Sequence, residues 1–124
     1  MTTARAAIVD VVLSAHAPVG AKDVLATLRA QKVRADVTTV YRELEFLREQ
    51  GVLSTVTFDD GVQRYESSDL GHHHHLVCTA CKRIQDVVVP HEQLHIAERE
   101  ILRTHRFSVL QHSLDFYGHC DRCR

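Results

Sequence analysis

The chain has 124 residues, of which 44% are hydrophobic, and a formal net charge of −1 at pH 7. This length suffices for one ordinary domain or for two small domains that share an interface. No apolar run approaches the length of a membrane span, and the N-terminus lacks the charged-then-apolar layout of a signal peptide, so we expect a cytoplasmic protein with no membrane segment. The nearly neutral charge does not by itself indicate nucleic-acid binding.

The first half of the chain is predicted to form three short helices with tight connections. Residues 4–15 form the first helix, and Pro18 ends that element before a second helix begins. The third helix starts at Asp36, a favourable N-cap residue, and stops at Gly51. Three such helices in close succession indicate a helix-turn-helix.

A two-stranded ribbon is predicted directly after these helices. The hydrophobic period changes to two over residues 53–58 and again over 62–66, and Asp60-Gly61 between them suits a tight hairpin turn. Helices followed by such a ribbon are typical of a winged helix, in which the third helix enters the major groove of DNA. We therefore expect a DNA-binding domain over residues 1–68.

Thr38, Thr39 and Arg42 would form the outer face of the third helix and are candidates for DNA contacts, and Tyr41, which lies among the apolar residues of the helix, is a further candidate. Arg42 can reach a phosphate or a guanine edge, the threonines can donate to phosphates, and the Tyr41 ring can contact thymine methyl groups. The alternative is an ordinary solvated face, because three glutamates lie on the same helix, and a tyrosine at this spacing is often a core residue.

The composition changes sharply near residue 70, because nine of the ten histidines and all four cysteines follow it. We place a second domain over residues 69–124. The pattern predicts a strand through 72–78, a returning strand over 84–89, a helix over 91–104 opened by Pro90, and a strand over 107–117. Leu94, Ala97 and Ile101 would form the inward face of the helix.

Two Cys-x-x-Cys pairs in this half predict a closed tetrahedral zinc site formed by Cys78, Cys81, Cys120 and Cys123. Such a site has no open position and is structural, since its binding energy becomes folding energy for a small domain. A thioredoxin-like redox pair is the alternative. That motif precedes a helix in a βαβ unit, whereas both pairs here flank predicted strands.

A run of four histidines enters the first cysteine pair, and strand geometry divides it between two faces. His73 and His75 share one face, where Asp86 from the returning strand and Glu66 from the ribbon can join them. Two imidazoles and two carboxylates suit Fe²⁺, Mn²⁺ or Zn²⁺.

The other two histidines of the run, His72 and His74, share the opposite face of the strand. They can meet His112 from the last strand, with Glu92 at the start of the helix. We expect a second metal site there, and because neither histidine site is closed by thiolates, both should bind more weakly than the cysteine site and exchange their ions. A solvated polar edge is the alternative for the whole run.

Four motifs in order, together with the winged-helix pattern, resemble the ferric uptake regulator superfamily over essentially the whole chain. They are Thr-Thr-Val-Tyr-Arg at 38–42, Glu66 at the end of the ribbon, His-His-His-His-Leu-Val-Cys-Thr-Ala-Cys-Lys at 72–82, and Tyr-Gly-His-Cys-Asp-Arg-Cys at 117–123. The resemblance implies an α+β fold with a winged helix-turn-helix domain followed by a small α/β dimerisation domain. It also implies a homodimeric, metal-dependent repressor, rather than an enzyme, that binds double-stranded DNA at AT-rich inverted repeats.

The resemblance assigns roles to individual residues of this chain. Tyr41 and Arg42 match positions that contact bases and phosphates, and Arg5 matches a basic position in the first helix. The cysteines match structural zinc ligands. The ligands of the family's sensory metal site, which links the two domains, are matched by Glu66, His73, His75 and Asp86. The third site matches His72, His74 and His112, and its usual acidic ligand aligns with Gln93, so we expect the neighbouring Glu92 to take that role.

Two departures from the family pattern bear on the sensed metal. Pro18 replaces a histidine that often completes the sensory site, which favours zinc, whereas Ser67 and Ser68 stand where zinc-uptake regulators commonly place a cysteine. Nitrogen and oxygen ligands without a thiolate favour iron or manganese. We therefore expect iron(II) control of metal-uptake genes, with a zinc-uptake regulator or a peroxide sensor of the same family as alternatives. A zinc hydrolase or a metal-buffering protein represents a different class.

Overall fold

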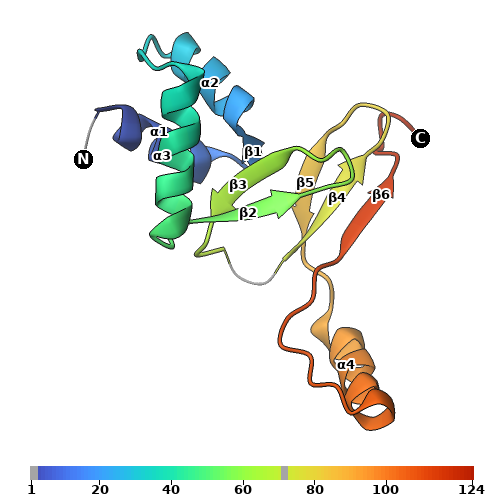
Figure 1. Cartoon of the computed structure of the whole chain (residues 1–124). Coiled ribbons are helices and arrows are strands. Elements are labelled where there is room, and N and C mark those ends of the chain that lie inside the picture. The colour runs from blue at the N-terminus through green and yellow to red at the C-terminus, as the bar shows by residue number, and fades with distance from the viewer. Residues whose placement is uncertain (1–2, 71–72) are drawn as a thin grey trace. The chain divides into compact units, whose positions relative to one another are not determined.

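The computed structural model describes residues 3–70 and 73–124, and the chain divides into two compact units, residues 1–71 and 72–124. Within the described part, no helix combines the length and the hydropathy that crossing a membrane requires. The two units have different architectures, and each is described separately (Figure 1).

The first unit is a winged helix. Its elements are α1 (Thr3–Ser14), β1 (Val19–Gly20), α2 (Ala21–Ala30), α3 (Val37–Glu49), β2 (Leu53–Thr57) and β3 (Gln63–Ser67). The strands form an antiparallel sheet in the order β1-β3-β2, and the three helices pack on one another beside it (Figure 1). The three helices and the hairpin confirm the sequence prediction, whereas the two-residue β1 was not predicted because so short a strand has no periodicity.

Local signals in the sequence explain where α3 and the hairpin begin and end. The Asp36 carboxylate accepts a hydrogen bond of 2.8 Å from the Thr39 N–H, as an N-cap should. Gly51, with φ +78°, follows the end of the helix, and Gly61, with φ +74°, lies in the hairpin turn. The core behind α3 is built from apolar residues of all three helices and the sheet: Ile8, Val12, Val24, Leu28, Val40, Leu44, Leu47, Leu53 and Tyr65.

The second unit contains β4 (His74–Cys78), β5 (Ile84–Val87), α4 (His91–His105) and β6 (Asp115–Gly118). Its sheet has the order β5-β4-β6, with β5 antiparallel and β6 parallel to the central strand β4. The parallel pair requires a crossover, and the segment containing α4 provides it.

Two predictions for this unit were wrong in part. The strand predicted over 107–117 is reduced to β6, because β4 begins at His74 and pairs with β6 only from Asp115 onward, which leaves 107–114 without a partner strand among the described residues. The predicted inward face of α4 is also wrong. No residue of α4 is buried, and the helix stands apart from the sheet of its own unit (Figure 1).

Candidate metal centres and nucleic-acid interface

The four cysteines converge at one end of the second unit's sheet, and their sulfur atoms all lie within 4.8 Å of one another. Cys78 ends β4, Cys81 follows in the turn before β5, and Cys120 and Cys123 follow β6. The Cys81 and Cys120 sulfurs are 3.8 Å apart. Two short turns on neighbouring strands thus present four sulfurs to one point, as a tetrahedral metal site requires.

Hydrogen bonding makes the four thiols chemically unequal. The N–H groups of Cys81 and Cys120 point at the Cys78 sulfur, at 3.4 and 3.5 Å, and lower the pKa of Cys78 to about 5. Hydrogen bonds among the neighbouring sulfurs, that with Cys120 first, raise the pKa of Cys123 to about 12. A divalent ion that displaces the remaining protons would satisfy all four sulfurs, so the donor set fits zinc.

A second cluster, free of thiolates, forms where β4 begins. The ligand atoms of His73, His75 and Asp86 lie within 4.8 Å of one another. The rings of His73 and His75 share one face of the strand, with centroids 4.9 Å apart, as alternation predicted. Asp86 is the cross-strand partner of His75 on β5, and its Oδ1 lies 3.5 Å from His75 Nε2 and 3.9 Å from His73 Nε2. These groups suit a borderline divalent ion.

Asp115 is a member of this region that the sequence pattern did not reveal. It is the register partner of His75 on the parallel strand β6, and its Oδ1 lies 3.3 Å from His75 Nδ1. His75 thus has a carboxylate at each ring nitrogen, one from each neighbouring strand. In the sequence, Asp115 stands out only by its position three residues after His112. That position indicates a contact with His75 only once the parallel register of β4 and β6 is known.

The opposite face of β4 carries His74, which is buried and stacks on His112 with centroids 5.4 Å apart. His112 Nδ1 lies 2.8 Å from Glu98 Oε1. The burial of His74 and the proximity of His112 lower the pKa of His74. A metal ion here would therefore find a neutral nitrogen on His74.

The acidic partner expected for this face, Glu92, lies elsewhere. A cavity of about 420 Å³ beside α4 is lined by His91, His95, Glu98, Leu110, Gln111 and His112, and neither Glu92 nor Gln93 contributes to its wall. His91 and His95 lie one helical turn apart, with centroids 5.8 Å apart. Both histidines thus share this cavity with His112. The remaining expected ligand, His72, lies outside the described residues.

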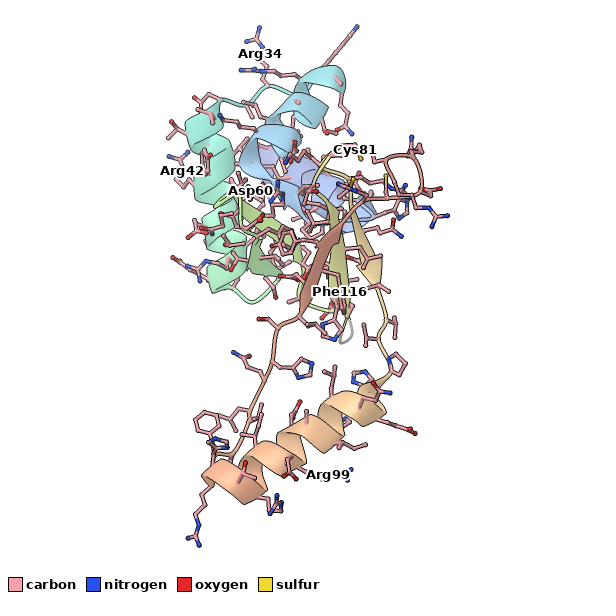
Figure 2. The ribbon with its side chains drawn as sticks, turned by 90° about the vertical axis from the view of Figure 1, so that its right-hand side faces the viewer. Arg34, Arg42, Asp60, Cys81, Arg99 and Phe116 are labelled. Atoms are coloured by element: carbon pink, nitrogen blue, oxygen red, sulfur yellow. The ribbon has the colours of Figure 1, made fainter. Side chains whose placement is uncertain are left out.

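In the first unit, the outer face of α3 presents Thr38, Tyr41 and Arg42 to solvent, whereas Thr39 is half-buried next to the N-cap. Tyr41 is 47% exposed and is not a core residue. Figure 2 shows Arg42 on the outer side of the helix. The Arg5 side chain, by contrast, contacts other residues of the same unit.

The Arg5 guanidinium has two partners on α3. Its Nε lies 2.5 Å from Glu43 Oε2, and its Cζ lies 4.1 Å from the centroid of the Phe46 ring. Both contacts hold the side chain against the helix rather than extending it into solvent. Glu66, the remaining expected sensory ligand, lies on β3 of this first unit.

Comparison with known proteins places this geometry in a family. The model of the ferric uptake regulator family matches residues 1–117. The chain is 35% identical to the ferric uptake regulation protein of Bacillus subtilis, over 99% of this chain and 84% of that protein. It is 27% identical to the peroxide-responsive repressor PerR of Staphylococcus aureus, over 100% of this chain and 82% of the repressor.

A solved structure agrees with these sequence matches. The iron-bound ferric uptake regulator of Francisella tularensis superposes with a TM-score of 0.86 at 25% identity, covering 99% of this chain and 92% of that one. The chain belongs to the ferric uptake regulator family of metal-responsive regulators.

Proposed function

We propose that this protein is an iron(II)-responsive transcriptional repressor that controls metal-uptake genes. One observation carries the proposal: His73, His75 and Asp86 converge without a thiolate, separately from the closed cysteine cluster. A family member with one closed thiolate site and one nitrogen and oxygen site can keep a structural zinc ion while exchanging a second ion with its surroundings.

In the proposed assignment, Cys78, Cys81, Cys120 and Cys123 hold structural zinc, and Glu66 joins His73, His75 and Asp86 as a regulatory ligand. Glu66 precedes the boundary between the units by five residues, so the ligands would come from both units. A shared ion would restrict the orientation of the winged helix. By thermodynamic linkage, metal binding and DNA binding would then strengthen each other by the same factor.

Within the second unit, Asp115 is proposed to position His75. Its carboxylate, at Nδ1, favours the tautomer that keeps the proton there and leaves Nε2 as the metal ligand. Nε2 is the nitrogen that faces Asp86. The protein thereby orients one regulatory ligand before any ion arrives.

The proposed partner for the second unit is another copy of the chain. The surface of the second unit includes many large apolar side chains, and the exposed fraction reaches 96% for Leu110, 75% for Val88 and 63% for Phe107. A 15-residue helix without a buried residue adds to this apolar surface. Homodimerisation would cover these side chains and provide two winged helices for the two halves of an AT-rich inverted repeat.

Arg42, Tyr41, Thr38 and Thr39 on α3 are the proposed base and phosphate contacts. Arg5 is proposed as a phosphate contact that becomes available when it leaves Glu43. In this proposal, Arg5 pairs with Glu43 when DNA is absent and contacts a phosphate when DNA is bound.

Elemental analysis of protein purified without oxygen, before and after mild chelation, tests the metal assignment. We expect one zinc per chain to be retained and one iron to be removed. His73→Gln should abolish the removable iron and leave the zinc, whereas His105→Gln, at the exposed end of α4, should change neither. Removable zinc in place of iron would identify a zinc-uptake regulator, and absence of the retained zinc would refute the cysteine assignment.

A peroxide sensor is the second candidate, favoured by the match to a peroxide-responsive repressor over the whole chain. Iron-loaded protein exposed to peroxide would then gain oxygen at His73 or His75. Mass spectrometry of the peptide containing residues 72–78 distinguishes the two functions, because an iron-responsive repressor should remain unmodified under mild peroxide.

A further inference from the structure

The helix α2 ends in a backbone motif that strongly favours glycine, yet its key position is a lysine. Lys32 adopts φ +60°, in the left-handed region. Its N–H donates to the Arg29 carbonyl at 3.0 Å, and the Val33 N–H donates to the Leu28 carbonyl at 2.9 Å. This pair of bonds defines a Schellman motif with Lys32 at the position after the C-cap, where a side chain opposes the required backbone conformation.

The same unit contains the same motif with the expected residue. α3 ends with an identical pair of backbone hydrogen bonds, and Gly51, with φ +78°, occupies the position that Lys32 occupies in α2. The two helix ends therefore differ at this position only in the side chain: α3 has glycine, whereas α2 has a lysine in a backbone conformation that side chains disfavour. Glycine would suit this backbone better, so what Lys32 adds is its positive charge, which also lies favourably at the C-terminal end of the α2 dipole.

The cations of the first unit divide into two groups. Three arginines form salt bridges with carboxylates: Arg5 with Glu43, Arg48 with Glu45 and Arg64 with Asp60. Over the described residues 3–70, the other five basic side chains form no salt bridge: Lys22, Arg29, Lys32, Arg34 and Arg42. Three of these five gather where α2 turns into α3.

An open groove of about 620 Å³ lies at this turn, and Arg29, Lys32 and Arg34 line it together with Thr39. Figure 2 shows Arg34 extending outward from the loop before α3. The one acidic side chain in the wall, Asp36, already accepts the Thr39 N–H at the start of α3. Three cations against one occupied carboxylate leave the groove with net positive charge in an otherwise nearly neutral protein.

We infer that this α2–α3 turn is a second DNA contact, which binds backbone phosphates beside the bases that α3 reads. Arg42 lies five residues after the start of α3, roughly 7.5 Å along a helix axis, and the major groove is about 12 Å wide. Thr39, which lines the groove with the three cations, lies only three residues before Arg42 on α3, so the groove adjoins the helix face that would enter the major groove. This inference rests on the DNA binding by α3 in the proposed function.

Phosphate contacts are independent of sequence, so a 30-base-pair duplex of random sequence is a sufficient probe. Binding of the full-length, zinc-containing, Mn²⁺-loaded protein is followed by fluorescence anisotropy from 50 to 300 mM salt. Lys32→Gly should lower the slope of log affinity against log salt by about 0.9 per chain, and weaken binding about five-fold at 0.15 M salt. Because glycine suits the backbone, the same variant should unfold at an equal or higher urea concentration.

Two further variants make the outcome specific. Lys32→Arg keeps the charge and should keep the wild-type slope. Lys82→Gly is the matched control, because Lys82 also has a left-handed backbone, with φ +68°, but lies in the second unit. It should leave the slope unchanged. A Lys32→Gly slope equal to wild type would overturn the inference while leaving the proposed function intact, whereas a wild type that binds no duplex would overturn both.

Discussion

The Asp115 carboxylate lies 3.3 Å from Nδ1 of His75, its register partner on the neighbouring parallel strand. A carboxylate at the distal nitrogen of a metal-binding histidine raises the basicity of the ligand and fixes its ring, and losing such a partner typically costs 10- to 100-fold in metal affinity.

Asp115→Asn should therefore weaken regulatory metal binding by roughly that factor, because a neutral amide polarises the imidazole less than a carboxylate does. Chelator competition with Fe²⁺ or Mn²⁺ measures this change. Asp10→Asn, on the exposed side of α1, makes the same chemical change away from the site and should have no effect. Equal affinities for the two variants would exclude a positioning role for Asp115.

Removing the carboxylate that holds Arg5 should strengthen binding to DNA. Glu43→Gln leaves the Arg5 guanidinium without its charged partner, which lies 2.5 Å away, and also removes a negative charge from α3. On a random duplex the salt slope should become steeper by up to about 1 per chain. Glu49→Gln removes a charge from the same helix without releasing Arg5, and so separates the two effects. Identical slopes for the two variants would count against a phosphate contact by Arg5.

The stability of the winged helix should fall above pH 10. Tyr65 is buried, and its hydroxyl donates to Glu45 at 3.0 Å; burial and this bond raise the pKa of Tyr65 to about 12. The folded state therefore retains the phenol proton between pH 10 and 12, whereas the unfolded state loses it. The stabilisation is complete below pH 10 and disappears as the pH approaches 12, by about 2 kcal/mol.

Urea unfolding at pH 9 and pH 11.5 measures this loss. Tyr65→Phe should be less stable than wild type at pH 9, because a hydrogen bond is absent, but should lose less stability on going to pH 11.5. Parallel losses in the two proteins would assign the alkaline transition to other groups.

Metal binding to the cysteine cluster should release protons at neutral pH. The pKa of Cys123 is raised to about 12, so this thiol holds its proton at pH 7, whereas the lowered pKa of Cys78, about 5, means that this sulfur has already ionised. Zinc affinity should therefore rise by at least about tenfold per pH unit near neutrality. Competition with a chelator of known pH dependence tests this slope, and affinity that does not change with pH would contradict the assignment.

Much of the architecture could be predicted from the sequence because its signals are local. The Asp36 N-cap, Gly51 after α3 and Asp60-Gly61 in the hairpin each act within a few residues, and alternation along one strand placed His73 and His75 on a common face. The cysteine spacing likewise predicted a cluster that the structure brings together.

The predictions that failed depended on tertiary pairing. The length of β6 is set by where β4 begins, and the role of Asp115 follows from a parallel register between segments 40 residues apart. The exposure of α4 could not be predicted either, because its helical periodicity is the same whether the apolar face meets its own sheet or another chain. The sequence pattern also suggested Glu92 beside His112, whereas the fold brings Glu98 there.

The short strand β4 carries residues of both candidate metal sites. His75 lies near its start and Cys78 is its last residue, roughly 10 Å away, and β6 is anchored beside both by the same ladder. In the proposed function, loss of the ion from the four cysteines would free the C-terminal end of β6 and weaken the register that places the Asp115 carboxylate beside His75. Occupancy of the proposed structural site would then affect metal binding at the proposed regulatory site without any change to the ligands of that second site.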